Sequence, residues 1–229
     1  MSYYYNIYTE AIVLRYINYG DNSLIARLYT RENGLISCIA KGVKKKSKKG
    51  TSKISYFLPL NICNINLYYS PDKEIHLLSD IHLVYYHQSL HIHFKKIAYT
   101  SLLTEFLLGV LHEDNQPYAI FDFLQSKIIQ LDQQNEQLLP LYLHILLNTS
   151  GYLGYQADEK IWENLLEPKY IHLKSYLHDL YYTSSQNYTL TEDEKKAILS
   201  TIEKFMKLHI HGFKGLQSTS IWEVIYSSP

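Results

Sequence analysis

The chain has 229 residues, of which 46% are hydrophobic and 19% charged, and its 22 basic side chains balance its 22 acidic ones. Such a chain can bury a core without disulfides, and its composition excludes a mainly disordered protein. The balance conceals an asymmetry, because residues 1–55 carry 10 Lys/Arg against 3 Asp/Glu, a net charge of +7, which leaves −7 for the rest. This basic N-terminal part indicates a polyanionic partner.

Features of export and membrane insertion are not evident in the sequence. The N-terminal residues do not read as a basic leader followed by an apolar core and a cleavage site. The longest apolar stretch, Leu102–Leu111, is interrupted by Thr104 and Glu105 and is too short to span a bilayer. Cys38 and Cys63 are expected to be reduced core residues. We therefore expect a cytoplasmic protein without a membrane anchor.

The first third of the chain has the pattern of successive strands. Its apolar residues come in short runs separated by turn-prone clusters. The runs are Glu10–Ile17, Ser23–Tyr29, Gly34–Ala40, Asn61–Tyr69 and Glu74–Leu78. Five short antiparallel strands favour a small closed barrel, because closure removes exposed edges without a second sheet.

After Val84 the hydrophobic period becomes helical. Apolar residues recur at three- and four-residue spacings over residues 97–111 and 121–131, and a third helix is expected from Leu138 to about Thr149. Thr191 begins a capping box for a last helix, which Gly212 is placed to end. Residues 155–190 have weaker periodicity and are predicted to be extended or irregular. The predicted fold is α+β, with a β-barrel domain in residues 1–84 and a mainly α-helical domain in residues 85–229.

The sequence carries none of the common motifs of catalysis or metal binding. The sequence has no GxSxG, HExxH or GxGxxG, and Lys48–Lys53 lacks the order of a phosphate-binding P-loop. The absence of these motifs weakens the case for catalysis without excluding it, and we expect no enzyme, no catalytic residues and no cofactor. The HxH pairs at His91 and His209 fall in regions predicted to be helical, where the two rings point to different sides, so no metal site is expected. Gly151–Gly154 matches a nucleic-acid-clamping GxxG but is interpreted as a helix terminus.

The most informative segment is Lys41–Lys53, which has seven lysines in thirteen residues and no acidic residue. It is predicted to be a mobile charged loop between the third and fourth strands. We interpret it as a phosphate-binding segment with steep salt dependence and little sequence preference; the alternative is a solvated loop that only aids solubility. Tyr16, Tyr19 and Tyr29 could stack on bases, or could simply fill the core.

Several short blocks then resemble a known family. Their positions are Ala11–Arg15, Tyr19–Ile25, Thr30–Leu35 and Ala40–Gly42 with lysines following, and downstream Leu147–Tyr155, Lys207–Ile210 and Leu216–Ser218. In order and spacing the first four resemble the N-terminal barrel of the bacterial DNA repair protein RecO family, and the others resemble its helical domain. The resemblance covers nearly the whole chain.

This resemblance implies an OB-fold followed by a mainly helical domain, and a recombination mediator that works without turnover chemistry in the bacterial cytoplasm, at the nucleoid. Members bind single- and double-stranded DNA, anneal complementary strands, engage the acidic C-terminal tail of the single-stranded-DNA-binding protein and join RecR to help load RecA. The match places DNA contact on Arg15, Arg27, Arg31, Lys41, Lys44, Lys45, Lys46, Lys48 and Lys49.

The sequence departs from the family in one respect. Many members hold zinc with four cysteines in the helical domain, whereas residues 155–190 contain none. Packing by Trp162, Leu165, Tyr170 and Leu173 is expected to replace the metal. A groove for the partner's tail could be rimmed by lysines such as Lys95, Lys96 and Lys127.

Two alternatives to the DNA-binding mediator stay open at this point. The first is an adaptor that docks protein partners through its helical domain. The second is an RNA-binding protein that uses the same barrel, because contacts to phosphates do not report the sugar.

Overall fold

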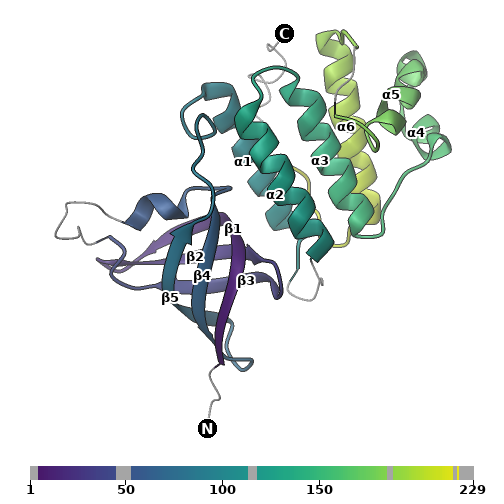
Figure 1. Cartoon of the computed structure of the whole chain (residues 1–229). Helices are drawn as coiled ribbons and strands as arrows, with labels where there is room; N and C mark the ends of the chain where they lie inside the picture. The colour runs from purple at the N-terminus through teal and green to yellow at the C-terminus, as the bar shows by residue number, and fades with distance from the viewer. Residues whose placement is uncertain (1–4, 45–52, 113–117, 185–187, 219–220, 222–229) are drawn as a thin grey trace. The chain divides into compact units, whose positions relative to one another are not determined.

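A computed structural model of the chain describes residues 5–44, 53–112, 118–184, 188–218 and 221 (Figure 1). The chain divides into two compact units, one made of residues 1–91 and 111–128 and the other of residues 92–110 and 129–229. The first unit is built on strands and the second on helices. A domain boundary between residues 84 and 85 stays a prediction.

The first unit contains a closed five-stranded barrel with the strand order β1-β2-β3-β5-β4. The strands are β1 (Tyr5–Tyr19), β2 (Ser23–Thr30), β3 (Gly34–Ala40), β4 (Ile62–Tyr69) and β5 (Ile75–Leu83). All neighbours are antiparallel except β3 and β5, which run parallel. The predicted α+β fold with an N-terminal OB-like barrel is confirmed, and the prediction that every pairing is antiparallel is wrong for this one pair.

Strand β1 is much longer than the predicted run Glu10–Ile17, because it pairs with two neighbours in turn. Its first part, Tyr5–Ile12, pairs with β4, and its second part, Ala11–Tyr19, pairs with β2. The extra residues at its start are mostly exposed, so they lack the apolar run by which a strand is recognised in sequence. Strand β5 likewise continues beyond the predicted Leu78 to Leu83, past a bulge opposite Asn66 and Leu67.

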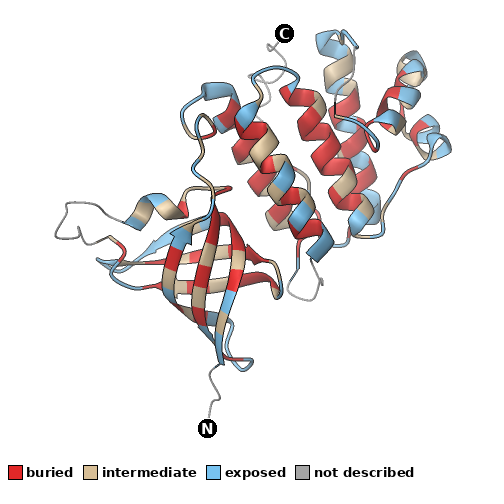
Figure 2. Ribbon diagram, in the orientation of Figure 1, coloured by how far each residue is buried: buried red, intermediate tan, exposed pale blue. Residues whose placement is uncertain are grey.

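Buried residues alternate with less buried ones along the strands (Figure 2), and the buried side chains of all five strands form the barrel core. The buried cluster comprises Ala11, Val13, Leu24, Ala26, Leu28, Ile36, Cys38, Ala40, Val43, Phe57, Cys63, Ile65, Leu67, Leu78 and Ile81. Both cysteines are free and buried there, and burial raises the pKa of each thiol to about 12. They therefore act as small core residues, as expected.

A short 3₁₀ helix, η1 (Lys53–Phe57), lies between β3 and β4 and carries buried Phe57 into the barrel core. The amide of Asn61 donates to the carbonyl oxygens of Ser55 at 2.9 Å and Tyr56 at 3.1 Å, and so fixes the end of this helix. Lys53 thus belongs to an ordered turn, not to the predicted charged loop. Residues 45–52 of that loop lie outside the described residues.

The helices are α1 (Phe94–Val110), α2 (Tyr118–Gln133), α3 (Leu138–Tyr152), α4 (Glu159–Leu165), α5 (Lys174–Asp179) and α6 (Glu192–His209), with a 3₁₀ helix, η2 (Pro168–Leu173). Helix α3 is the most apolar of the second unit and buries nearly every residue from Leu138 to Leu147, which is typical of a central helix. In the described chain, no helix has both the length and the apolar character needed to cross a membrane.

The predicted helix ends are confirmed. Thr191 and Glu194 form a reciprocal capping box at the start of α6, and Gly212 takes a left-handed φ of 81° after its end. Gly154, with a φ of 91°, follows the end of α3, so the GxxG sequence at Gly151 is a helix terminus.

The prediction for residues 155–190 is wrong for much of that segment, because α4, η2 and α5 lie there. Asp158 caps α4 by accepting a hydrogen bond from the Ile161 N–H at 2.9 Å, and Pro168 begins η2. Helices of six or seven residues are too short to repeat an apolar period. Their signal in the sequence was therefore weak.

Candidate nucleic-acid interface

Two arginines lie side by side on the outer surface of the barrel. Arg15 on β1 and Arg27 on β2 are direct partners in the antiparallel ladder. A bulge between Val13 and Arg15 lets Val13 and Leu14 both be buried and turns Arg15 outward. Like charges directly opposite each other on two strands destabilise a sheet. The fold therefore maintains a cationic pair that an anion would stabilise.

The third strand fixes one of these arginines. Arg27 donates from Nη1 to the Oγ of Ser37 on β3 at 2.7 Å, and the two residues are also ladder partners. This bond holds the guanidinium along the sheet surface. Arg15 is exposed and makes no ion pair within the part of the chain that the structure describes.

Lys41 and Lys44 lie near the β1–β2 turn. Lys41 directly follows β3 and is exposed. The ammonium of Lys44 donates to the carbonyl oxygen of Gly20 at 3.1 Å, and its backbone N–H donates to that of Asn22 at 3.4 Å. The first residues of the lysine-rich segment are thus held against that turn. The predicted contacts Lys45, Lys46, Lys48 and Lys49 lie outside the described residues.

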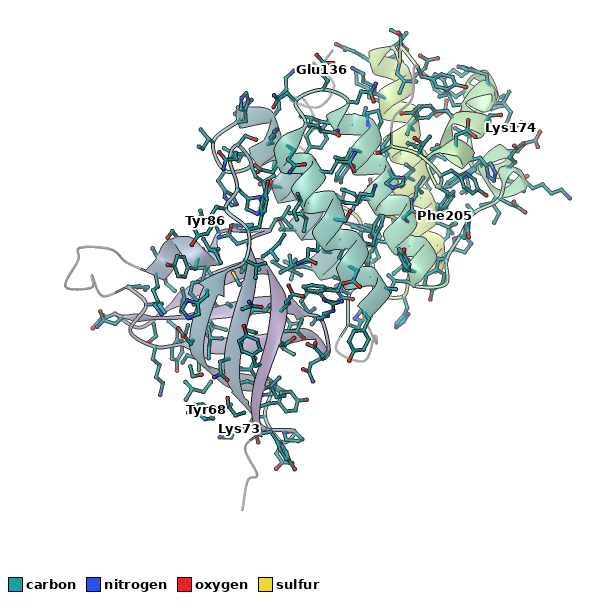
Figure 3. The ribbon with its side chains drawn as sticks, viewed as in Figure 1. Tyr68, Lys73, Tyr86, Glu136, Lys174 and Phe205 are labelled. Carbon is teal, nitrogen blue, oxygen red and sulfur yellow. The ribbon has the colours of Figure 1, made fainter. Side chains whose placement is uncertain are left out.

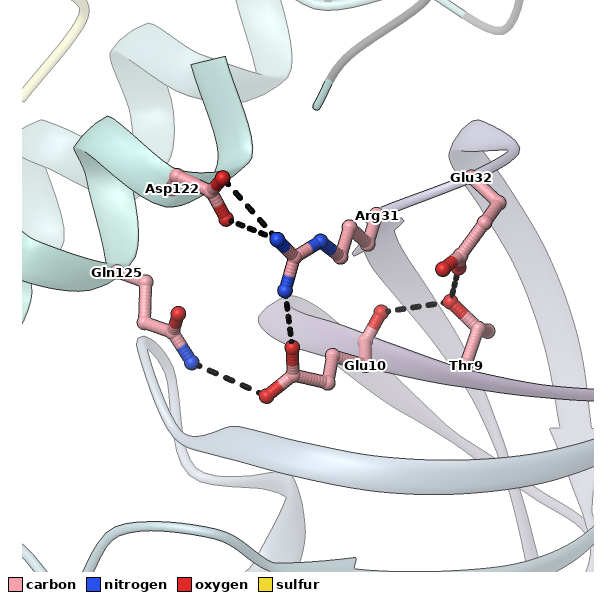
Figure 4. A network of polar contacts seen from close by, with 6 residues as sticks. All are labelled: Thr9, Glu10, Arg31, Glu32, Asp122 and Gln125. Atoms are coloured by element: carbon pink, nitrogen blue, oxygen red, sulfur yellow. Dashed lines mark hydrogen bonds and ion pairs between the residues drawn. The ribbon is translucent and has the colours of Figure 1, made fainter. Parts of the chain in front are cut away.

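Arg31 has a different environment, since it follows β2 at the end remote from this turn. Its Nη1 lies 2.7 Å from the Oε2 of Glu10, and its Nη2 lies 2.9 Å from the Oδ1 of Asp122 on α2 (Figure 4). Gln125 donates to the other oxygen of Glu10 at 3.2 Å. The hydrogen bond to Glu10 is the main cause that raises the pKa of Arg31. Two carboxylates thus balance this guanidinium, and its contact with DNA stays a prediction.

Lys53 is also neutralised locally. Its ammonium lies 2.8 Å from the Oδ1 of Asp80 on β5, and that hydrogen bond is the main reason why the pKa of Asp80 falls to about 2. His82 lies 2.7 Å from the other oxygen of Asp80. The positive charge counted for residues 1–55 is therefore partly internal, because carboxylates neutralise Arg31 and Lys53. Arg15 and Lys41 stay exposed.

The three candidate stacking tyrosines differ in exposure. Tyr19 ends β1 and is 55% exposed, whereas Tyr29 is completely buried and stacks on Phe121 with ring centroids 6.3 Å apart. Tyr16 is half-buried and packs partly against the barrel core. Tyr29 therefore fills the core, and of the three only Tyr19 presents most of its ring to solvent.

A groove of about 580 Å³, absent from the sequence prediction, opens on the outside of the barrel, where β3 and β5 run parallel. Its lining residues are Ile39, Lys41, Tyr68, Ser70, Lys73, Ile75, His76 and Leu77. Tyr68 could have been found in the sequence, because strand alternation places it on the outer face with Asn64 and Asn66. Lys73 lies in the β4–β5 turn, and its proximity to Lys41 depends on the parallel pairing, which the sequence does not reveal.

Comparison with known proteins assigns the family. The model for the recombination protein O N-terminal domain matches residues 1–87, and the model for its C-terminal domain matches residues 92–160. The chain belongs to the RecO family. DNA repair protein RecO of Flavobacterium psychrophilum is 27% identical, over 96% of this chain and 99% of the relative, and that of Christiangramia forsetii is 28% identical over the same shares. DNA repair protein RecO of Chlorobium luteolum is 30% identical over 66% of this chain and 56% of the relative.

The zinc site that the family resemblance implies does not fit this chain. Its only cysteines are Cys38 and Cys63, both in the barrel core. Within the described ranges no cluster of three or more His, Cys, Asp or Glu residues could hold a metal ion. His91 instead bonds the carbonyl oxygen of Pro59 at 2.8 Å, and His209 bonds that of Phe205 at 2.8 Å.

An apolar cluster occupies the region where the cysteines would be expected. Trp162 of α4 is fully buried and contacts Phe205 of α6 with ring centroids 5.1 Å apart. Leu173 of η2 is also buried, whereas Leu165 and Tyr170 are half-buried. The residues proposed to replace the metal thus include two buried members.

Lys96 is not available to rim a groove for a partner. It is 1% exposed, and its ammonium donates to the backbone carbonyl oxygen of Asp132 at 2.6 Å. Burial lowers its pKa. Lys95, the preceding residue, is exposed.

Proposed function

We propose that this chain binds single- and double-stranded DNA through the outer face of β1, β2 and β3 and acts as a recombination mediator without turnover chemistry. In this role it anneals complementary strands in the cytoplasm and, with RecR, helps load RecA on DNA covered by the single-stranded-DNA-binding protein, whose acidic C-terminal tail it engages. The relatives carry the name DNA repair protein RecO.

The observation that carries the proposal is the Arg15–Arg27 pair. The outer face of strands β2 and β3 is the surface with which OB-folds bind oligonucleotides, together with the β1–β2 and β4–β5 loops. Here Arg27 lies on that face beside Arg15 of β1, and Lys44 is held against the β1–β2 turn. Phosphates placed on this face would relieve the repulsion between the arginines and release condensed counterions. Screening of both strands' phosphates would also permit annealing.

A salt titration of the full-length protein tests DNA binding. Fluorescence anisotropy with single- and double-stranded oligonucleotides is expected to give an affinity that falls steeply with salt. The double variant Arg15→Ala/Arg27→Ala is expected to lower the affinity and to reduce the slope of log K against log salt by about 1.4 to 1.8, the contribution of two phosphate contacts. A second variant replaces Lys44, Lys45, Lys46, Lys48 and Lys49 by Ala. It is expected to lower the affinity and the slope of log K against log salt further.

The matched control is Lys160→Ala/Lys204→Ala, which removes two exposed cations from α4 and α6 of the second unit. It is expected to bind like the wild-type protein. Absence of oligonucleotide binding at low salt would refute the proposal, as would equal losses in the control and the arginine variant. The same titration with RNA oligonucleotides decides whether the barrel prefers DNA.

Partner binding separates the mediator from the adaptor. Purified RecR and a peptide with the acidic tail sequence are expected to bind the full-length protein, and the arginine variant is expected to keep both interactions while it loses DNA. Binding of both partners by a protein that retards no oligonucleotide would favour the adaptor.

A further inference from the structure

The groove beside the β4–β5 turn lies on the same outer surface as the arginine pair. Ladder partners continue from Arg15 through Arg27 and Ser37 to Ile75, which lines the groove. The neighbouring row continues from Ile17 through Ile25, Ile39 and Leu77 to Tyr68. A strand bound along the arginine row would therefore reach the groove without leaving the sheet surface.

The walls of the groove suit a flat, weakly polar group. Tyr68 is 44% exposed and lies opposite Leu77 in the β4–β5 ladder, and Leu77 lies opposite Ile39 in the β3–β5 ladder. Side chains of direct ladder partners contact one another on a sheet face. An aromatic ring beside two aliphatic side chains forms a surface on which a nucleobase stacks.

Two lysines line the groove on different segments. Lys41 follows β3, whereas Lys73 lies in the β4–β5 turn, and both are exposed. Figure 3 shows Lys73 and Tyr68 at the same end of the barrel. Lys41 makes no ion pair among the residues that are described. Two ammonium groups beside an apolar wall can bind a phosphate while the attached base lies on that wall.

The groove also contains a buried hydroxyl group, which indicates a ligand independently of the tyrosine and the lysines. Ser70 lines the groove and is only 1% exposed, yet its Oγ has no hydrogen-bond partner within the described chain. Its backbone N–H donates to the Nδ1 of His76 at 3.4 Å, and the His76 ring stacks on Tyr69 with centroids 4.3 Å apart. A buried polar atom without a partner is costly, and a ligand with a donor or acceptor edge would satisfy it.

We infer that this groove binds one unstacked nucleotide of a single strand, an inference that rests on the proposed function. The base lies against Tyr68 and Leu77, its polar edge meets the hydroxyl of Ser70, and its phosphate lies between Lys41 and Lys73. The volume of about 580 Å³ falls in the range of small-molecule sites and accommodates one nucleotide. Bases paired within a duplex cannot enter, so the groove favours single strands.

Aromatic and hydroxyl substitutions test this site in the full-length protein. Tyr68→Ala is expected to weaken binding of a single-stranded oligonucleotide by about 5- to 150-fold, the effect of one lost stacking contact, and to leave duplex binding unchanged. Tyr68→Phe keeps the ring and is expected to retain affinity. Tyr86→Ala is the matched control, because Tyr86 is 68% exposed, follows β5 and lies outside the groove. Ser70→Ala is expected to weaken single-strand binding by less than Tyr68→Ala.

The base and the phosphate are tested separately. Fluorescence of 2-aminopurine within a single-stranded oligonucleotide is expected to change on binding to the wild-type protein and not to Tyr68→Ala. Lys41→Ala/Lys73→Ala is expected to lower the slope of log K against log salt by about 0.7, the contribution of one phosphate contact on a single strand. Thymidine monophosphate is expected to compete with the oligonucleotide at concentrations at which inorganic phosphate does not.

The outcomes distinguish this inference from the proposed function. If the wild-type protein binds oligonucleotides but Tyr68→Ala and Lys41→Ala/Lys73→Ala bind like Tyr86→Ala, the nucleotide site is refuted and DNA binding stands. Equal competition by inorganic phosphate would also refute a site for a base. If the wild-type protein binds no oligonucleotide, both proposals fail.

Discussion

Arg15 and Arg27 are direct partners across the β1–β2 ladder, and Arg27 is held by a 2.7 Å hydrogen bond to Ser37. Two cations opposite each other lower the stability of the sheet, by about 0.2–1 kcal/mol for a pair of this kind. Arg15→Gln is therefore expected to raise the free energy of unfolding slightly while it weakens DNA binding. Urea unfolding and a salt titration of DNA affinity measure the two effects on the same variant.

Lys204→Gln removes an exposed cation from α6 of the second unit, outside the barrel, and serves as the control. It is expected to change neither quantity. A loss of stability in Arg15→Gln would contradict the assignment of this pair to ligand binding.

The Lys53–Asp80 ion pair predicts a specific acid sensitivity of the barrel. The pKa of Asp80 falls from its usual 3.8 to about 2, mainly because Lys53 donates a hydrogen bond to it. Since the pKa is lower in the folded protein, the stabilisation is fully present above about pH 4 and is lost as the pH falls through about 2. Both side chains are about half-exposed, so the contribution is limited to about 0.2–1 kcal/mol.

Unfolding measured from pH 5 to pH 2 in the wild-type protein and in Lys53→Met checks this expectation. The difference in stability between the two proteins is expected to shrink as the pH approaches 2 and to be smaller at high salt. A difference that is constant over this range would show that Lys53 acts through packing alone.

Arg31 is expected to contribute to the stability of the first unit more than to DNA binding. Its guanidinium joins Glu10 of β1 to Asp122 of α2, so Arg31→Met leaves both carboxylates without their counter-charge. We expect a lower melting temperature and a smaller loss of DNA affinity than in Arg15→Gln. Differential scanning calorimetry and the salt titration provide the two measurements.

Asp122→Asn gives the complementary test, because it removes one carboxylate from Arg31. If Arg31 binds phosphate in the complex, Asp122→Asn will strengthen DNA binding. Unchanged affinity together with a lower melting temperature is the result that a structural role predicts.

Aromatic packing is expected to replace metal binding in the second unit. Phe205 is 1% exposed and contacts both Trp162 and His209. Phe205→Ala is therefore expected to cost about 3–5 kcal/mol of stability, the usual effect of emptying an aromatic core position. Addition of a zinc chelator is expected to leave the melting temperature of the wild-type protein unchanged. A drop in that temperature with the chelator, restored by zinc, would contradict this account.

Periodicity in the sequence predicted the regular elements well where one face of an element is buried. Leu24, Ala26 and Leu28 alternate with partly exposed residues in β2, and this pattern marked the strand. The start of β1 and the end of β5 were missed, because Tyr5 and Tyr8 are exposed there and the pairing with β4 is made by the backbone. Helices α4 and α5 were missed because their stability comes from packing.

The candidate site was only partly predictable. The positive net charge of residues 1–55 predicted a binding surface on the barrel. Which of these cations form ion pairs within the protein depends on carboxylates that are distant in the chain. Asp122, 91 residues beyond Arg31, and Asp80, 27 residues beyond Lys53, redistribute that charge. Sequence alone does not reveal such partners, nor that the parallel pairing of β3 and β5 brings Lys41 and Lys73 into one groove.

The order of strands in the barrel has a consequence for synthesis of the protein. Strand β1 pairs with β4, and β3 pairs with β5. The barrel therefore cannot close until Leu83, the last residue of β5, has been synthesised and has left the ribosome exit tunnel. A nascent chain arrested before this point exposes backbone donors and acceptors along β3 and β4, which other chains can pair with. Slow codons or truncations upstream of Leu83 are therefore where co-translational aggregation of this chain is to be sought.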